Sequence, residues 1–333
     1  MLLSLLAKLY GKVANVRNRL YDRGIFETHD LRARTISIGN ITTGGTGKTP
    51  LVAYVARVLA ERGEKVCILT RGYGRKDSSK RVLVSDSQQI LASVLDSGDE
   101  PFELAQKLLG KAMVIADADR VAAADWAVRK FGVTAFVLDD GFQHRRANRD
   151  LDIVCIDATD PFGKRQMLPA GRLREPIENL RRADAVVISR ADLAGIDNLK
   201  FEISDLKPQI PIFTTVNRIA RVISLKQDEG SLVDVSTRRA LAFCGLGNPE
   251  NFYALLRRDG FAVAETLSFR DHHNYSQDDA TDLEGAARDC RAEILLTTAK
   301  DAVKLAGLDI DMPCYVVEIE VQIDDAAAFA QLL

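Results

Sequence analysis

The chain has 333 residues, a length that suggests two domains. Hydrophobic residues make up 47% and charged residues 28% of it, a balance that argues against a disordered or fibrous protein. The net charge of −2 leaves no overall basic field, so we expect no nucleic-acid partner. No two cysteines stand at CxxC spacing, which argues against a zinc site or disulfide framework and favours a reducing cytosol; they are Cys67, Cys155, Cys244, Cys290 and Cys314.

Residues 1–20 predict an amphipathic helix. Its apolar side chains recur at three- and four-residue steps: Leu2, Leu5, Leu6, Leu9, Val13 and Val16. Basic side chains interrupt the segment before about 20 apolar residues accumulate, so it is too polar to span a membrane; they are Lys8, Lys12, Arg17 and Arg19. Two interpretations stay open. The helix lies in a membrane interface, or it packs on the core of its own protein.

Short apolar runs alternate with helical stretches along the first part of the chain. The runs are typical of buried parallel strands and cover residues 35–41, 66–70, 112–116, 133–138, 153–156 and 185–189. Helices are predicted over residues 51–62 and 119–131. This alternation indicates an α/β fold built on a parallel sheet.

The pattern changes near Pro208. Beyond it we predict extended segments at 212–216 and 221–225, a polar turn at 227–231, a new α/β unit from 240–244 through 295–298, a strand at 314–323 and a last helix at 326–333. The predicted organisation is therefore a large domain at 1–215, a smaller α/β domain at 226–312, and a connecting strand with a final helix at 313–333.

A glycine-rich loop between a predicted strand and a predicted helix is the strongest signal in the chain. It reads TTGGTGKTP at residues 42–50, and the backbone N–H groups of such a loop cradle phosphate. Lys48 would reach the β- and γ-phosphates, and the Thr49 hydroxyl would bind Mg²⁺. The pattern is closer to the deviant GGxGKT form than to GxxxxGK[ST]. The nucleotide contacts that it predicts are Thr43, Gly44, Gly45, Thr46, Gly47, Lys48 and Thr49.

An apolar strand that ends in two carboxylates predicts the partner of the metal. Residues 136–140 read FVLDD, the Walker B pattern, in which Asp139 and Asp140 would hold Mg²⁺. Capping of a turn at the strand end is the simpler alternative. Gln143 follows directly and would line the same edge of the sheet, where ligands bind in such folds.

Several motifs, in order along nearly the whole chain, resemble the tetraacyldisaccharide 4'-kinase family, the lipid A 4'-kinases of Gram-negative bacteria. They are GNITTGGTGKTP (39–50), TRGYG (70–74), GDEP (98–101), LDDGFQH (138–144), LPAGRLREP (168–176), FRDH (269–272) and TAKDAVK (298–304). The resemblance implies a P-loop kinase domain that moves the γ-phosphate of ATP to the 4'-hydroxyl of a tetraacylated glucosamine disaccharide 1-phosphate, which gives lipid IVA. It also implies work at the cytoplasmic face of the inner membrane, where the N-terminal helix holds the protein.

The resemblance also implies roles for single residues. Asp99 matches the candidate general base of the family, supported by His272, although the adjacent His273 leaves that assignment open. By itself, Asp99 reads only as a capping or first-turn acid of a helix. Gln143 would contact the nucleotide. The implied substrate contacts are Arg71, Tyr73, Glu100, Arg120, Arg172, Arg174 and Glu175. Lys300 and Asp301 belong to a motif whose role the sequence does not reveal.

Two other classes of protein share part of this pattern. A membrane-associated NTPase switch that acts on a protein partner would explain the phosphate loop, Asp139 and the basic N-terminal helix, but not Asp99, His272 or the arginines. A GTP-dependent metal-delivery protein is disfavoured because the chain has no Cys/His cluster.

Overall fold

The computed structural model describes residues 2–226, 234–271, 273–305 and 307–333. The chain divides into two compact units: Met1–Val216 together with Val321–Leu333, and Asn217–Glu320. The chain crosses from the first unit into the second within β8 (Ile212–Ser224) and returns within β12 (Cys314–Ile323). The predicted smaller domain at 226–312 lies inside the second unit, which begins earlier because β8 continues to Ser224.

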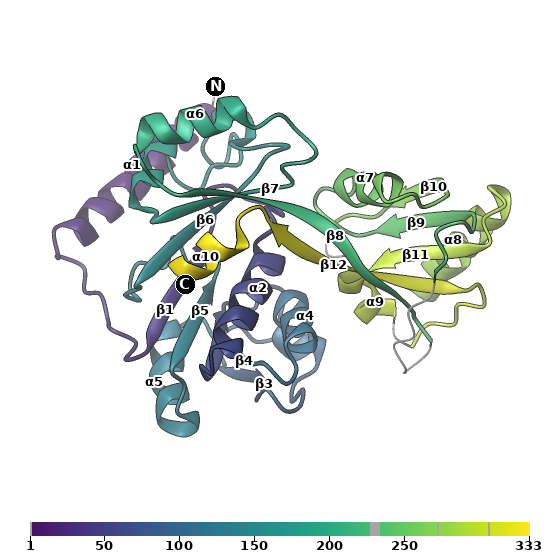
Figure 1. Ribbon diagram of the computed structural model, residues 1–333, viewed down its shortest axis with the longest axis horizontal. Helices are drawn as coiled ribbons and strands as arrows, with labels where there is room; N and C mark the ends of the chain where they lie inside the picture. The colour runs from purple at the N-terminus through teal and green to yellow at the C-terminus, as the bar shows by residue number, and fades with distance from the viewer. Residues whose placement is uncertain (1, 227–233, 272, 306) are drawn as a thin grey trace. The chain divides into compact units, whose positions relative to one another are not determined.

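The sheet of the first unit has the strand order β8-β7-β6-β1-β5-β2-β4-β3 (Figure 1). The pairs from β8 to β4 are parallel, and β3 joins the edge antiparallel to β4. Strand β1, which leads into the glycine-rich loop, lies between β5 and β6. The strands are β1 (Arg34–Gly39), β2 (Val66–Thr70), β3 (Val82–Ser85), β4 (Ala112–Ala116), β5 (Ala135–Asp139), β6 (Leu151–Asp157), β7 (Ala185–Ser189) and β8.

Helices cover both faces of this sheet. They are α1 (Leu2–Asp22), α2 (Lys48–Glu61), α3 (Val94–Ser97), α4 (Asp99–Lys107), α5 (Arg120–Phe131), α6 (Asp197–Leu206), α10 (Ala326–Leu332) and the 3₁₀ turns η1 (Gly163–Arg165) and η2 (Ile177–Arg182). Alternate residues of a strand point to opposite faces. Accordingly, Val66 and Ile68 pack in the core that holds α2, α4 and α10, whereas Cys67 and Leu69 pack against α5.

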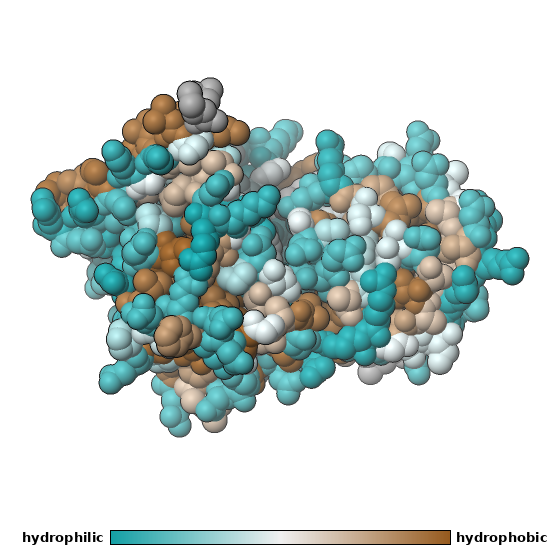
Figure 2. All heavy atoms as spheres, turned by 90° about the horizontal axis from the view of Figure 1, so that it is seen from above, coloured by the Kyte–Doolittle hydropathy of each residue, from teal (hydrophilic) through white to brown (hydrophobic). Residues whose placement is uncertain are grey.

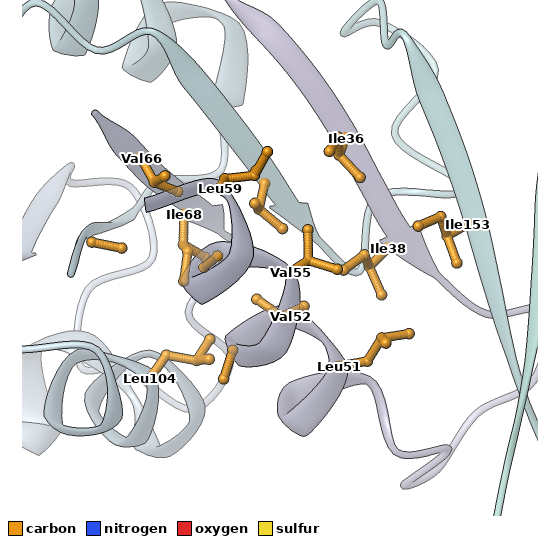
Figure 3. Packing of buried hydrophobic residues seen from close by; sticks show 14 of the residues in the cluster. Ile36, Ile38, Leu51, Val52, Val55, Leu59, Val66, Ile68, Leu104 and Ile153 are labelled. Atoms are coloured by element: carbon orange, nitrogen blue, oxygen red, sulfur yellow. The ribbon is translucent and has the colours of Figure 1, made fainter. Parts of the chain in front are cut away.

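The core under α2 holds the glycine-rich loop in place. Val52, Val55 and Leu59 of α2 are fully buried and pack with Ile36 and Ile38 of β1 (Figure 3). Burying each such side chain is worth about 1.5–3 kcal/mol. Because β1 and α2 are locked together, the loop that joins them has fixed ends.

The second unit is a smaller parallel sheet of order β10-β9-β11-β12. Its further elements are β9 (Ala240–Cys244), α7 (Glu250–Arg258), β10 (Val263–Ser268), α8 (Gln277–Asp289), β11 (Ile294–Thr298) and α9 (Ala299–Leu305). Tyr253 of α7 is fully buried, and its hydroxyl donates to the carbonyl oxygen of Leu267 over 2.8 Å.

The predicted fold class, a P-loop-type parallel sheet with a second, smaller α/β unit, is confirmed. Two predicted extended segments, 212–216 and 221–225, form the single strand β8, in which Arg221 pairs with Glu318 of β12 over 2.6 Å. The short edge strand β3 was not predicted. The predicted turn at 227–231 lies outside the described residues.

Candidate active site

The glycine-rich loop is anchored by side chains from two neighbouring strands. Gly47 caps α2 in a left-handed conformation with φ of 82°, and a Cβ there would lie 3.0 Å from the Cβ of Ser189. Thr46 is buried, and its carbonyl oxygen accepts hydrogen bonds of 2.8 Å from Cys155 Sγ and Ser189 Oγ. Side chains of β6 and β7 thus fix the loop backbone. The N-terminus of α2 that follows offers backbone N–H groups to an anion.

Two arginines donate hydrogen bonds to backbone carbonyl oxygens of the same loop. Arg172 donates to the carbonyl oxygen of Thr43 from Nε (2.9 Å) and Nη2 (2.6 Å). Arg190, which follows β7, donates from Nη2 to the carbonyl oxygen of Gly45 over 2.7 Å and pairs with Asp157 over 2.5 Å. Arg190 is not among the site residues predicted from the sequence. Its place directly after a parallel strand was the one available signal, since such strand ends line the ligand edge.

The two predicted metal-binding carboxylates lie at the end of β5, beside Lys48. Lys48 Nζ is 3.6 Å from Asp140 Oδ1, and Arg174 Nη1 is 2.6 Å from Asp140 Oδ2. Asp139 is almost fully buried, and its Oδ2 accepts a hydrogen bond of 2.9 Å from Thr70 Oγ1. The structure therefore brings the phosphate-loop lysine and both carboxylates to one edge of the sheet.

The two carboxylates have opposite electrostatic environments. Burial, reinforced by the negative charges of Glu100 and Asp140, raises the pKa of Asp139 to about 6. Burial acts the same way on Asp140, but the positive charges of Lys48 and Arg174 outweigh it and lower the pKa of that carboxyl. Asp140 is thus held as an anion, whereas the charge on Asp139 is costly.

These residues fit Mg²⁺ bound together with a nucleotide. Asp140 Oδ1 is buried and accepts no hydrogen bond from the described residues. Across residues 2–226, 234–271, 273–305 and 307–333, no group of three or more His, Cys, Asp or Glu side chains is arranged to hold a metal by itself. Mg²⁺ usually binds through one or two carboxylates plus phosphate oxygens and water, so a complete protein cage is not needed here. Thr49 stands in the first turn of α2 and is half-buried.

Two glycines bring the Arg71–Tyr73 segment against Asp99. A Cβ on Gly72 would lie 2.8 Å from the carbonyl oxygen of Ser97, and one on Gly98 would fall on the carbonyl oxygen of Tyr73. Asp99, half-buried, is the first residue of α4. Arg71 is exposed, with Nη1 3.4 Å from the Tyr73 hydroxyl and its guanidinium 5.3 Å from the ring centroid. Asp99 and Arg71 therefore belong to two segments that pack against each other beyond the end of β2.

Three other predicted contacts have protein partners. Arg120 is buried and donates from Nη2 to the carbonyl oxygen of Asp139 over 3.0 Å. Gln143 donates from Nε2 to the carbonyl oxygen of Asn40 over 2.8 Å. Glu175 is buried and accepts hydrogen bonds within the protein, described below. Arg120 and Gln143 thus support the loops of the edge.

The histidines of the second unit are described only in part. His272 lies outside the described residues. The ring of His273 stacks on Phe269 at a centroid distance of 4.7 Å, and its Nε2 is 3.1 Å from Asp279 Oδ2. The predicted partnership of Asp99 with a histidine therefore stays a prediction.

The motif at residues 298–304 contributes a buried anchor of the second unit. Asp301 is fully buried and accepts hydrogen bonds from the Gly245 backbone N–H (3.1 Å), the Tyr275 hydroxyl (3.1 Å) and Thr298 Oγ1 (2.6 Å). Lys300 Nζ is 3.2 Å from Asp271 Oδ1. Asp301 joins the ends of β9 and β11, a role that the sequence alone did not reveal.

Helix α1 turns its apolar face to the outside. Leu5 is 65% exposed, Leu9 58% and Val13 58%, and Figure 2 shows hydrophobic surface in brown where α1 lies. The buried face carries small or polar residues instead, among them Ala7 and Asn18. The interpretation in which the leucines pack on the protein's own core is therefore wrong. None of the described helices is both long and apolar enough to cross a membrane.

Comparisons with known proteins agree with this geometry. The family described as Tetraacyldisaccharide-1-P 4'-kinase matches residues 1–333. The tetraacyldisaccharide 4'-kinase of Halothermothrix orenii is 38% identical over 100% of this chain and 91% of its own length, and that of Geobacter metallireducens is 41% identical over 91% and 88%. The crystal structure of "apo" form LpxK from Aquifex aeolicus in complex with ATP has a TM-score of 0.78 and 35% identity, and covers 98% of this chain and 96% of its own. The chain therefore belongs to the tetraacyldisaccharide-1-phosphate 4'-kinase family.

Proposed function

We propose that this ATP-dependent kinase transfers the γ-phosphate of ATP to the 4'-hydroxyl of a tetraacylated glucosamine disaccharide 1-phosphate at the edge formed by Lys48, Asp139 and Asp140. The product is lipid IVA. The observation that carries this proposal is the convergence of a phosphate cradle, two Walker-type carboxylates and the acid Asp99 on one edge of the first unit's sheet. Family membership does not favour the alternative, an NTPase switch that acts on a protein.

The loop and Lys48 would bind the phosphates of ATP. The backbone N–H groups at Gly47 and the first turn of α2 offer donors and the positive end of the helix dipole. From its place 3.6 Å from Asp140, Lys48 would also neutralise charge on the β- and γ-phosphates. The other nucleotide contacts in this proposal are Thr43, Gly44, Gly45, Thr46, Thr49 and Gln143.

Thr49, Asp139 and Asp140 would hold Mg²⁺. Bound there, the ion would neutralise charge on the phosphates as the transferred group moves. Lys48 and Arg174 lower the pKa of Asp140, so this carboxylate would meet the ion as an anion. Burial raises the pKa of Asp139 although Lys48 and Thr70 partly offset it, and a bound cation would lower that pKa further.

Asp99 would act as the general base. It takes the proton of the 4'-hydroxyl while that oxygen attacks the γ-phosphorus, and the bond from the γ-phosphorus to the bridging oxygen breaks to release ADP. His272 would support Asp99, with His273 as the alternative. Support for this role comes from the close packing of Gly98 on Tyr73, which fixes the first turn of α4 at the ligand edge.

The acceptor would be recognised by cations around Asp99. Arg71 is the leading contact for the substrate phosphate, since its guanidinium is exposed and lies next to Tyr73. Glu100, Arg120, Arg172 and Arg174 complete the proposed contacts by resemblance to the family. Glu175, also implied by that resemblance, is buried among Asn18, Asn179 and Arg182 and would act through its neighbour Arg174 without touching the acceptor.

The exposed face of α1 would lie in the cytoplasmic surface of the inner membrane. Its leucines can bury apolar area among the lipids. Lys8 and Lys12 would attract anionic head groups, and each would contribute about 1 kcal/mol to the free energy of membrane binding. The acceptor's acyl chains stay in the bilayer, so the kinase must come to them. Peripheral attachment accounts for both the exposed apolar face and the small, polar buried face.

A transfer assay in detergent micelles tests the reaction. With γ-labelled ATP and the disaccharide 1-phosphate, we expect labelled lipid and ADP to form in equal amounts. Lipid IVA itself, whose 4'-position is already phosphorylated, is the matched control and should accept no label. ATP turnover that does not respond to the acceptor would contradict the proposal.

A further inference from the structure

Residues 172–175, here called the strap, run along the catalytic edge. Arg172 and Thr43 exchange backbone and side-chain hydrogen bonds, and Leu173 forms an antiparallel bridge with Thr42. The backbone N–H of Arg174 donates to the carbonyl oxygen of Ile41 over 2.7 Å. The strap is thus paired with the chain that leads into the phosphate loop.

The next two side chains of the strap point to different partners. Arg174 donates to Asp140 Oδ2 over 2.6 Å, so the strap also sets the position of a proposed metal ligand. Glu175 is only 2% exposed, and its Oε2 accepts hydrogen bonds from Asn18 Nδ2 (2.6 Å), Asn179 Nδ2 (2.8 Å) and Arg182 Nη2 (2.9 Å). A buried carboxylate needs such donors, because it has lost its hydration.

Asn18 belongs to α1 and is itself 5% exposed. Its neighbour Arg17 donates from Nη2 to the carbonyl oxygen of Gln143 over 2.9 Å, three residues after Asp140. Two successive residues of α1 therefore hold the two segments that flank Asp140. The exposed leucines lie on another face of the same helix, so one continuous helix carries both the exposed apolar face and the contact to the strap.

We propose that Asn18 and Glu175 are positioning residues. They couple the packing of α1 on the first unit to the Arg174–Asp140 pair, so that α1 affects the rate of phosphate transfer as well as the attachment of the protein to the membrane. The link to the membrane rests on the proposed function above. The contact between Asn18 and Glu175, by contrast, is a property of the fold and can be tested without a membrane.

The first test measures kcat and the KM for ATP with a short-chain, soluble acceptor. Asn18→Leu keeps the side-chain size but removes the donor, and we expect kcat to fall about tenfold, as happens when a group that orients a metal ligand is lost. The KM for ATP should change less than kcat, because Cys155 and Ser189 anchor the phosphate loop independently. Arg19→Gln, at the next residue of α1, is the matched control, because Arg19 is exposed, and it should keep the wild-type kcat on this soluble acceptor.

Rescue separates positioning from a general loss of stability. Asn18→Asp would face Glu175 with a second carboxylate and should lower kcat at least as much as Asn18→Leu. Combining Asn18→Asp with Glu175→Gln restores a donor–acceptor pair and should recover most of the rate. A folded Asn18→Leu protein with wild-type kcat would overturn the proposal, and so would a folded swapped pair as slow as Asn18→Asp.

Vesicles of phosphatidylglycerol and phosphatidylethanolamine test the link to the membrane. They should raise the wild-type kcat on the soluble acceptor, and Asn18→Leu should bind them normally but lose this activation. Vesicle binding without activation would overturn the coupling to the membrane. Absence of vesicle binding in the wild type would instead contradict the proposed membrane role of α1, while the result with the soluble acceptor still decides the role of Asn18.

Discussion

Lys48 and Asp140 form an ion pair at the junction of α2 and β5, with Nζ 3.6 Å from Oδ1 and both side chains largely buried. The pair places the one charge that the phosphate loop needs beside the carboxylate that is held as an anion. Nucleotide phosphates and Asp140 are therefore expected to share Lys48 as a common counter-ion.

Lys48→Met should abolish transfer and leave the fold intact. The substitution keeps the aliphatic stem but removes the charge that stabilises the phosphates in the transition state, a loss worth about 10²–10³-fold in kcat. Asp140 keeps its contact with Arg174, so the melting temperature should stay close to that of the wild type. Steady-state transfer and thermal unfolding measure the two effects, and a folded variant with near-normal kcat would refute the role of Lys48.

Asp99→Ala should lower kcat far more than it raises the KM for ATP. A base acts only on the acceptor hydroxyl, and its loss typically costs about 10²–10⁴-fold. His272→Ala should have a smaller effect, and the double variant should lose less than the product of the two single losses if the residues act as a unit. Fully multiplicative losses, measured in the same transfer assay, would show that they act separately.

The stability of the nucleotide-free protein should respond to pH through Asp139. Its folded pKa of about 6 lies above the ordinary value, so the folded state holds the proton more tightly than the unfolded state. The contribution of this proton to the free energy of unfolding is full below about pH 4. It is lost as the pH rises through 6, which lowers the free energy of unfolding by up to about 3 kcal/mol.

Asp139→Asn should therefore be more stable than the wild type at pH 8, and the difference should shrink toward pH 4. The amide oxygen can still accept from Thr70. Denaturant unfolding of both proteins across this range isolates Asp139 from the other carboxyl groups. Equal stabilities at pH 8 would contradict the raised pKa.

Gly98→Ala should damage activity more than the replacement of another glycine that has a positive φ. Gly98 has φ of 90°, and its Cβ would collide with the carbonyl oxygen of Tyr73, so the backbone at Tyr73 must move away from the start of α4, where Asp99 lies. Gly110→Ala is the matched control, because φ is 80° there and nothing lies within 4 Å of the added Cβ. Both changes strain the backbone, Gly98→Ala the more because φ of 90° with ψ of 161° is open essentially to glycine alone, but only Gly98→Ala should lower kcat. Equal kcat in both variants would argue against this packing as a support for catalysis.

Polar replacements on the outer face of α1 should release the protein from membranes without unfolding it. Leu5→Ser with Leu9→Ser removes exposed apolar area, so vesicle sedimentation should fall while the melting temperature holds. Leu95→Ser, at a side chain 75% exposed on α3, is the control and should not alter binding. Deletion of residues 1–20 should do more, since it also removes the buried Asn18. Unchanged sedimentation of the double variant would contradict the membrane role.

The sequence by itself determined the elements whose signal is local. The strand at 66–70 and the glycine-rich loop were predictable because a buried apolar run and a phosphate loop are written in consecutive residues. The edge strand β3 was not predicted, because it is short and pairs on one side only, so its burial pattern is weak. Strand β8 was split in the prediction because exposed residues interrupt its apolar pattern.

Only the tertiary structure decided which face of α1 is buried and what Glu175 contacts. The leucine periodicity is the same for a helix packed on a core and for one exposed to a bilayer, and the small residues that pack inward carry no signal of their own. Glu175 meets Asn18 across a sequence separation of 157 residues, and Arg190 meets Gly45 across 145. Such pairs depend on how every strand between them is ordered in the sheet, and no local pattern encodes that order.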